Sequence, residues 1–500
     1  MQLLANDVRE RDDLIAEVGA SAAAGRYAES LALIARALGT TPNDPQLILA
    51  RAATLFAWRR CWEARDACLR AATLGLLSKK LYLHAGWSCF AVGKIDEAAG
   101  WMQKAVAVDP ESADSHLNLA VALQAQERHD DAVASYQRAL ALQPGDFDCH
   151  IGLGSCYLRK GDAAAAEIHF RRAIAVDSGR AVAWQDLGAA LGRQRRYEES
   201  LQAFGYAHSL ETKEDTDSFV SLAVALSEAG KTREALVLYE SNLPRRPNAG
   251  GYYAYSHLLL ATGQFRLGWR YHESRWLNDP QVSLRPDFRR PVWAGQQLRG
   301  KTILLHVEQG FGDIIQFIRY APQIKALGAT VLLRVSRPMQ KLARRFAGVD
   351  RIVSRDESLP EFDFYIHVLS LPRVFDTDLG SIPAEIPYLN ADRVQSGRPE
   401  RLAGDGVVTI GLAWAGNPAH PNDRYRSLSL QALARLGEVE GVRWVSLQKG
   451  QAAGEAEAPP PGLELVNLGP ELEDFCDTAA VIDQLDLVLC VDTAVAHLAG

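Results

Sequence analysis

Three polar turns, each following a predicted β-strand, contain the residue types that could do chemistry. The first turn contains Gly310, Gly312 and Asp313. Glycine lets another molecule approach the backbone closely, so Gly310 and Gly312 are predicted to lie on the acceptor side of a site. Asp313 could take the proton of an attacking hydroxyl as a general base; a cap at the start of the following helix is the alternative, and one residue can do both. A nicotinamide cofactor is disfavoured, because Ile315 stands where a dinucleotide fingerprint has its third glycine.

The second turn contributes positive charge. Arg424 and Arg426 follow the strand that ends near Trp414, and Lys449 follows the next strand. A guanidinium can hold two oxygens of a diphosphate, and a lysine adds a further charge. We therefore predict that these three residues bind a diphosphate. The alternative is that the arginines are surface residues paired with Asp423.

The third turn joins an apolar strand to a helix and contains Asp492, Thr493 and His497. Thr493 is predicted to cap the helix. The free N–H groups and the positive end of the helix dipole at this point can receive a pyrophosphate without a metal ion. His497 lies four residues after Thr493, hence on the same face of the helix, from which it could reach a phosphate or sugar oxygen. A purely structural histidine is the alternative.

Parallel strands are the elements that must position these turns. From about residue 300, short runs rich in Val, Ile and Leu alternate with amphipathic stretches, which indicates an α/β fold. A polar segment with Gly and Pro, residues 393–406, interrupts the pattern as a linker does. We therefore predict two Rossmann-like domains, residues 283–392 and 407–500, with a cleft between them where a nucleotide and an acceptor meet. The second domain ends a few residues into a helix and is predicted to be truncated.

Residues 1–282 are predicted to form a helical repeat with a period of 34 residues. An alanine recurs at this interval, a second small residue precedes it by seven positions, and a bulky residue lies between the two. Two helices approach closely only where side chains are small. The recurring alanines are Ala37, Ala71, Ala105, Ala139, Ala173 and Ala207. These residues resemble the tetratricopeptide repeat family, which implies an all-α superhelix with a concave groove that binds partners.

The predicted groove lacks the recurrent asparagines with which some members of this family clamp an extended peptide. The sixth position of successive repeats is occupied by Ala16, Ala50, His84, Asn118, Gly152 and Asp186. We predict that the groove recruits a protein or glycan acceptor. A scaffold or an oligomerisation arm is the alternative.

The second half resembles bacterial glycosyltransferases of the ADP-heptose:lipopolysaccharide heptosyltransferase type, a family 9-like group with the two-domain GT-B fold. The resemblance lies in the strings EQGFGDIIQFIRYAP (308–322), IGLAWAGNPAHPNDRYRSLSL (410–430) and DTAVAHLAG (492–500). Ala494 and Gln448 depart from the glycine and the acidic residue that are usual in the family. The chain is identified as a tetratricopeptide superhelix followed by an α/β GT-B region.

The resemblance implies an inverting, metal-independent transfer of a hexosyl or heptosyl group from a nucleoside diphosphate, with no further cofactor. Asp313 would be the general base and Arg426 would contact the diphosphate. Asp492, Thr493 and His497 would bind phosphate and sugar. Two alternatives remain: a non-catalytic repeat adaptor with a degenerate glycosyltransferase domain, and a protein O-glycosyltransferase of the repeat-containing type.

Composition and charge argue against several other classes. The formal net charge of −7 disfavours nucleic acid as the main partner, because phosphate backbones bind to positive potential. No stretch approaches 18 apolar residues and no export leader is recognisable, so we expect a cytoplasmic protein without a membrane span, with the inner membrane surface as an alternative location. Seven cysteines without a CxxC pair indicate neither a disulfide framework nor a zinc ribbon. The Asp-Thr-Asp strings at 215–217 and 376–378 are not predicted to bind a metal.

Overall fold

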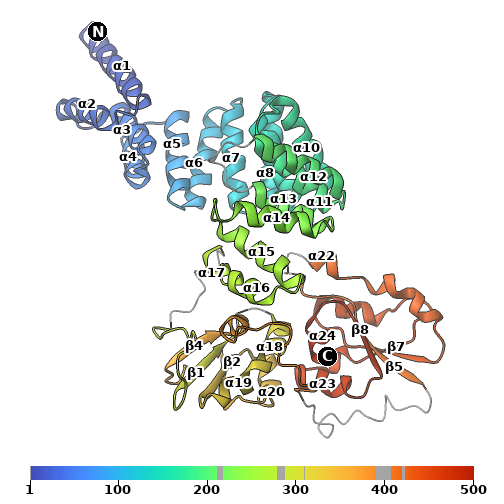
Figure 1. The fold of residues 1–500 in the computed structure, drawn as a ribbon. Helices are drawn as coiled ribbons and strands as arrows, with labels where there is room; N and C mark the ends of the chain where they lie inside the picture. Colours follow the sequence, from blue (N-terminus) through green and yellow to red (C-terminus); the bar gives the residue numbers. More distant parts are fainter. Residues whose placement is uncertain are drawn as a thin grey trace. The chain divides into compact units, whose positions relative to one another are not determined.

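The computed structural model describes residues 2–210, 218–278, 288–308, 310–389, 407–418, 420 and 423–500. The chain divides into two compact units, Met1–Gly251 and Tyr252–Gly500 (Figure 1). Helical residues 252–278, which the sequence assigns to the repeats, are part of the second unit. The predicted linker, residues 393–406, lies outside the described residues.

The first unit is all-α in its described residues, and consecutive helices pack against one another (Figure 1). Asp44, Ser78 and Asp146 begin three of the helices by accepting hydrogen bonds from backbone N–H groups of the first turn. The helices are α1 (Gln2–Ala23), α2 (Tyr27–Thr40), α3 (Pro45–Ala57), α4 (Cys61–Thr73), α5 (Lys79–Ala91), α6 (Ile95–Val108), α7 (Ala113–Ala125), α8 (His129–Leu142), α9 (Phe147–Arg159), α10 (Ala163–Val176), α11 (Ala181–Arg193), α12 (Tyr197–Leu210), α13 (Ser218–Glu228) and α14 (Thr232–Asn242).

A residue in the left-handed conformation separates the two helices of each repeat. The backbone φ is +76° at Gly25, +77° at Gly93 and +87° at Gly161, a region that glycine enters without a steric penalty. The intervening repeats adopt positive φ without glycine, at Arg59, Glu127 and Arg195. These six positions follow one another at intervals of 34 residues, which confirms the predicted period.

Small residues on the first helix of a repeat face bulky residues on the second. A Cβ added to Gly154 would lie 2.4 Å from Cε1 of Phe170, and a Cβ added to Gly188 would lie 2.9 Å from Cδ2 of Phe204. Phe170 is fully buried, so its ring has little room to move. Each bulky side chain therefore fills the space that a missing Cβ leaves sixteen residues earlier.

The second unit opens with helices and continues as two parallel sheets with further helices (Figure 1). Its helices are α15 (Ala249–Ala261), α16 (Phe265–His272), α17 (Arg275–Asn278), α18 (Phe311–Phe317), α19 (Ala321–Ala326), α20 (Gln340–Ala343), α21 (Leu371–Val374), α22 (Asp423–Arg426), α23 (Phe475–Ile482) and α24 (Ala494–Ala499). Its strands are β1 (Thr302–His306), β2 (Thr330–Val335), β3 (Arg351–Ser354), β4 (Phe364–His367), β5 (Val408–Ala413), β6 (Val442–Ser446), β7 (Leu465–Asn467) and β8 (Leu487–Cys490).

The two sheets share one topology. Their strand orders are β3-β2-β1-β4 and β7-β6-β5-β8, and all pairs are parallel. The first strand of each sheet therefore lies in the middle, as Leu304 does between Leu332 and Tyr365. The predicted strands and the parallel α/β arrangement are confirmed. Parallel strands place their carboxyl ends at one edge of the sheet, where the turns of interest begin.

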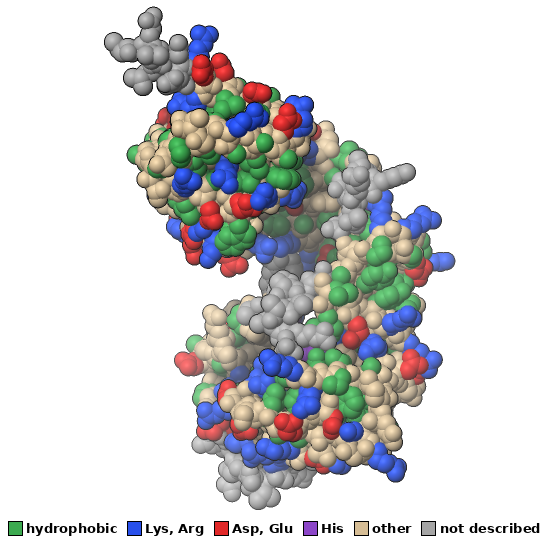
Figure 2. Space-filling model, turned by 90° about the vertical axis from the view of Figure 1, so that its left-hand side faces the viewer, with side chains coloured by type: hydrophobic (Ala, Val, Ile, Leu, Met, Phe, Trp, Pro, Cys, Tyr) green, Lys and Arg blue, Asp and Glu red, His purple; other side chains and the backbone are tan. Residues whose placement is uncertain are grey.

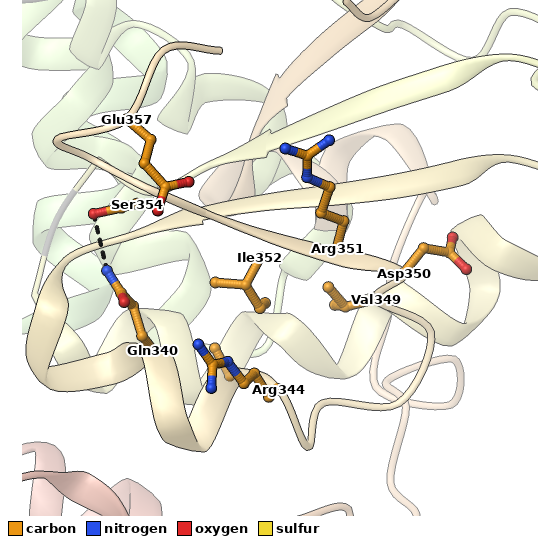
Figure 3. A pocket seen from close by; sticks show the side chains of 9 residues that line it. Gln340, Arg344, Val349, Asp350, Arg351, Ile352, Ser354 and Glu357 are labelled. Carbon is orange, nitrogen blue, oxygen red and sulfur yellow. Dashed lines mark hydrogen bonds between the residues drawn. The ribbon is translucent and has the colours of Figure 1, made fainter. Parts of the chain in front are cut away.

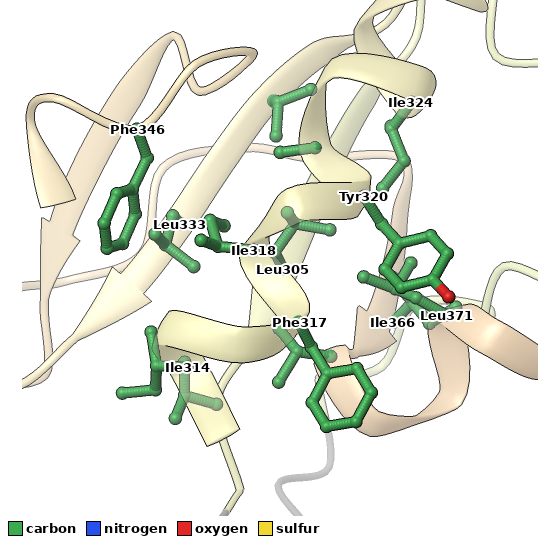
Figure 4. Close-up of a cluster of buried hydrophobic side chains, with 14 of the residues drawn as sticks. Leu305, Ile314, Phe317, Ile318, Tyr320, Ile324, Leu333, Phe346, Ile366 and Leu371 are labelled. Carbon is green, nitrogen blue, oxygen red and sulfur yellow. The ribbon is translucent and has the colours of Figure 1, made fainter. Parts of the chain in front are cut away.

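The core of the first sheet joins strands to the segment after β1 (Figure 4). Leu305 and Leu333 are fully buried against Ile314 and Ile318. The helical segment between β1 and β2 is divided: α18 ends at Phe317, a 3-10 turn follows, and α19 begins next to Pro322. Proline has no N–H to donate and so favours the first turn of a new helix.

Positive and negative side chains are intermixed on the face that Figure 2 draws. None of the described helices combines the length and the apolar character that crossing a membrane requires.

The fit between glycine and ring in the repeats predicts opposite effects for two Gly→Ala changes. Gly154→Ala should destabilise the protein by about 1–3 kcal/mol, because the new methyl group overlaps the buried Phe170 ring. Gly100→Ala in α6 has nothing within 4 Å of the new Cβ and should stabilise the protein by up to about 1 kcal/mol through helix propensity. Urea unfolding monitored by circular dichroism measures both, and equal effects would contradict the proposed packing.

Candidate functional site

The first and third predicted turns lie against each other within the second unit. α18 begins at Phe311 and α24 at Ala494, and the two helices are in contact. A Cβ on Gly312 would lie 2.6 Å from Cδ2 of His497, so only glycine leaves room for the imidazole ring. The rings of Phe311 and Phe475 lie 4.9 Å apart, between centroids, and join α18 to α23. The turn after β1 and the turn after β8 therefore face one another.

Asp313 is the third residue of α18, and its side chain is partly buried. Its Oδ2 accepts a hydrogen bond from the Gly310 N–H at 3.1 Å. Burial raises the pKa of Asp313; Asp492 acts in the same direction, while the Gly310 N–H and the charges of His497 and His420 oppose the rise. The Asp313 carboxylate thus accepts a hydrogen bond from the backbone at the start of α18. Its raised pKa also makes it a stronger base than an ordinary aspartate.

Thr493 has the extended backbone of a residue that precedes a helix, but its side chain makes no capping hydrogen bond. Thr493 therefore occupies the predicted cap position without the side-chain bond of a cap, and the Ala496 N–H donates to the backbone carbonyl of Thr493 at 3.0 Å instead. Thr493 Oγ1 is buried and has no hydrogen-bond partner in the part of the chain that the structure describes. Buried hydroxyls are normally paired, so this one keeps an unused donor and acceptor.

Buried polar groups hold the backbone of the second turn. Gln448 Oε1 accepts hydrogen bonds from the N–H groups of Trp414 and Ala415, both at 2.9 Å. Gln448 Nε2 donates to the Ala415 carbonyl at 2.9 Å. The Gly416 N–H donates to Ser427 Oγ at 2.8 Å. These bonds fix the course of the chain directly after β5.

Arg426 connects the second turn with the third. Its Nε lies 3.5 Å from Asp423 Oδ1, and its Nη1 lies 3.7 Å from Asp492 Oδ2. Gly416 makes room for this pair, because a Cβ there would lie 2.6 Å from Asp423 Oδ1. Arg426 therefore pairs with Asp423, as the alternative interpretation predicted, and also approaches the third turn. The Arg424 side chain lies outside the described residues.

Lys449 donates hydrogen bonds to the backbone of its own sheet region. Its Nζ donates to the carbonyls of Gly469 at 3.0 Å and Leu472 at 2.6 Å, and these bonds stabilise the turn that follows β7. The contact of Lys449 with a diphosphate stays a prediction. The predicted residues that the fold brings together are Gly310, Gly312, Asp313, Arg426, Asp492 and His497.

A buried charged cluster next to the first turn has no counterpart in the sequence-based predictions. Glu308 is 9% exposed, and its Oε1 accepts a hydrogen bond from Arg275 Nη2 at 3.0 Å. Burial raises the pKa of Glu308 to about 7, although Arg275 opposes the rise. Burial also lowers the pKa of His306 to about 4. One feature of the sequence could have identified Glu308: it is a polar residue directly after an apolar strand. The same feature applies to Gln448.

A polar cavity of about 300 Å³ lies apart from these turns, beside β3 and α20 (Figure 3). Gln340 and Arg344 face it from α20 and the residue after it, and Arg351 and Ser354 face it from β3. Gln340 Nε2 donates to Ser354 Oγ at 2.9 Å. None of the predicted site residues whose side chains are described lines this cavity.

The first unit contains one of the two Asp-Thr-Asp strings, 215–217, which lies outside the described residues. In the other, Asp376 and Asp378 are ion-paired with Arg266. Within the described ranges, no three His, Cys, Asp or Glu side chains are grouped so as to hold a metal ion.

Comparison with known proteins identifies the repeats. The tetratricopeptide repeat model matches residues 83–147 and 117–183. Protein FlbA of Caulobacter vibrioides is 26% identical over 372 residues, and the alignment covers 68% of this chain and 61% of that protein. The chain thus spans about three fifths of the length of this curated relative.

Solved structures of repeat proteins are similar to parts of the chain. A tetratricopeptide repeat protein from Parabacteroides merdae is 16% identical and covers 48% of this chain and 96% of its own, with a TM-score of 0.43. YrrB, described as a tetratricopeptide repeat protein with an unusual peptide-binding site, is 20% identical and covers 40% and 97%, with a TM-score of 0.33. The family match establishes that residues 83–183 of this chain are tetratricopeptide repeats.

Proposed function

We propose that the second unit transfers a sugar from a nucleoside diphosphate to an acceptor, and that the repeats bind the protein that carries this acceptor. The observation that carries the proposal is the meeting of three turns from two parallel sheets. Asp313 stands at one side of this meeting point, and Arg426, Asp492 and His497 stand at the other. Two sheets of identical topology with a site between their carboxyl edges also support a GT-B type of assembly.

Asp313 would act as the general base. Its carboxylate takes the proton of the acceptor hydroxyl while the acceptor oxygen attacks the anomeric carbon of the sugar. The bond from that carbon to the diphosphate breaks, so the configuration is inverted. A carboxyl that is partly removed from water has a raised pKa and is correspondingly more basic.

Arg426 and Thr493 would stabilise the leaving diphosphate. The guanidinium of Arg426 can donate two parallel hydrogen bonds to phosphate oxygens. Its position 3.7 Å from Asp492 directs it toward the third turn. The hydroxyl of Thr493, which has no hydrogen-bond partner among the described residues, would supply a further donor in the same turn as Asp492.

One observation favours the alternative of a non-catalytic adaptor. The imidazole of His497 lies directly on Gly312, at the place expected for close approach of an acceptor. An acceptor can enter there only if this contact opens. Turnover of a donor decides between the two functions, because an adaptor hydrolyses and transfers nothing. Mass spectrometry of co-expressed partner proteins tests the related possibility of protein O-glycosylation.

Asp313→Asn should lower turnover by roughly 100- to 10,000-fold, while the affinity for the nucleoside diphosphate stays unchanged. The folded state raises the pKa of this carboxyl, so its contribution to stability is present at low pH and is lost as the pH rises through that pKa. The variant should therefore melt higher than the wild type at pH 8, and the difference should vanish in acid.

Asp376→Asn is the matched control, since Asp376 is an exposed carboxylate of the same sheet region whose side chain is 73% exposed. It should keep the wild-type rate and melting profile. Donor hydrolysis and differential scanning fluorimetry across pH 4–9 measure the two effects. Wild-type turnover in Asp313→Asn would refute the assignment of the base.

Arg426→Ala should weaken binding of nucleoside diphosphates by roughly 10- to 100-fold, the value of a hydrogen bond to a charged group. Arg435 lies exposed in the same sheet region, and Arg435→Ala should leave the affinity unchanged. Isothermal titration calorimetry with a panel of nucleoside diphosphates measures both variants. Equal affinity in the wild type and Arg426→Ala would remove Arg426 from the donor site.

A further inference from the structure

Arg275, in the short helix α17, is a buried arginine with several charged and polar partners. Its side chain is only 6% exposed. Nη1 donates to Glu273 Oε1 at 2.8 Å, and Nη2 donates to Glu308 Oε1 at 3.0 Å and to Ser370 Oγ at 2.8 Å. Ser370 Oγ donates in turn to Glu273 Oε1 at 2.8 Å. The planar guanidinium therefore holds three side chains in fixed positions relative to one another.

Two of these partners lie at the carboxyl edge of the first sheet. Glu308 follows β1 by two residues, and Ser370 follows β4 by three residues. Because β1 and β4 are neighbours in the sheet, Arg275 connects the two chain segments that leave this edge. Glu308 stands two residues before Gly310, which begins the turn that carries Asp313.

The same helical segment also contacts the far end of that turn. Trp269 of α16 packs edge-on against Phe317, the last residue of α18, with ring centroids 5.5 Å apart. Glu308 and Phe317, which lie before and after the start of α18, are thus held by α17 and α16, respectively. Asp313 lies between the two anchors.

The ion pair of Arg275 differs from a surface ion pair because it is buried. Removing one partner of a buried ion pair leaves the other charge uncompensated, so Glu308 must take up a proton or the surrounding backbone must rearrange or admit water. Arg266 offers a contrast, because it also joins α16 to the sheet region but is 61% exposed in its ion pairs with Asp376 and Asp378. Exposed pairs of this kind contribute little.

We propose that Arg275 is a positioning residue for the candidate base: through Glu308 and Ser370 it fixes the turn that carries Asp313. The proposal rests on the glycosyl transfer proposed above for its catalytic consequence. Its structural part concerns the turn alone. Misplacement of a reacting group by about 1 Å can lower the rate on the order of 100-fold, so a fixed turn matters to a base.

The test compares Arg275→Met, Arg275→Lys and the control Arg266→Gln in the full-length chain. Hydrogen–deuterium exchange with mass spectrometry reports on the amides of residues 308–317 without any need for turnover. We expect clearly faster exchange of this segment in Arg275→Met, a smaller increase in Arg275→Lys, which keeps the charge but not the fork, and no change in Arg266→Gln. Peptides of α5–α10 serve as an internal reference for folding.

Kinetics supply the second readout. With a donor that the wild type turns over, kcat of Arg275→Met should fall about 10- to 100-fold while KM for the donor stays within about twofold, because the donor-binding residues lie on the other sheet. Arg275→Lys should recover part of kcat and keeps the test open if the methionine variant does not fold.

The outcomes separate the two proposals. Unchanged exchange of residues 308–317 in both Arg275 variants would overturn the positioning role, and so would faster exchange with an unaltered kcat. If the wild type turns over no donor while Arg275→Met still exchanges faster, the transferase proposal fails and the anchoring of the turn stands.

Discussion

The contact on which the candidate site depends is that of the His497 ring with the backbone at Gly312. A Cβ at this position would lie 2.6 Å from the ring, a distance that packed atoms do not adopt, so the ring can keep its place only against a glycine. From this contact follows the proximity of His497 and Asp492 to Asp313. Arg426 approaches Asp492 for a separate reason, because the strands that precede them, β5 and β8, are neighbours in one sheet. A group of residues that the sequence spreads over nearly 200 positions thereby shares one environment.

The repeats show which structural features a regular sequence pattern predicts and which it does not. Their period follows from helix lengths and from one left-handed turn residue, and the turn keeps its conformation even where Arg59, Glu127 and Arg195 replace glycine. The pattern of small residues predicted close helix contacts. It did not predict that Gly154 leaves room for Phe170, because this pairing depends on where two side chains meet after the helices have packed.

In the candidate site, too, the positions of elements could be predicted and the contacts of individual side chains could not. Strand ends could be located from apolar runs, so the turns carrying Asp313, Arg426 and His497 were found. Hydrogen bonds of individual side chains could not be located in this way. The Thr493 side chain makes no capping hydrogen bond, and Lys449 Nζ donates to the carbonyls of Gly469 and Leu472. Both outcomes depend on local backbone geometry that the residue types do not determine. The pair formed by Arg275 and Glu308 joins residues 33 positions apart, and no periodicity indicates such a contact.

Residues 263–276 (GQFRLGWRYHESRW) resemble the other repeats only weakly. The contacts of α16 and α17 give a physical reason for this. The hairpin of α15 and α16 keeps the local geometry of a repeat, with φ of +80° at Gly263 and close approach of Gly268 to Leu260. Its outer residues, however, pack against the sheet region, where Trp269 meets Phe317 and Arg275 meets Glu308. Side chains at these positions are constrained by a partner that is not another repeat. The consensus of the repeat is consequently lost there, while the turn and the helix contact that define the hairpin are retained.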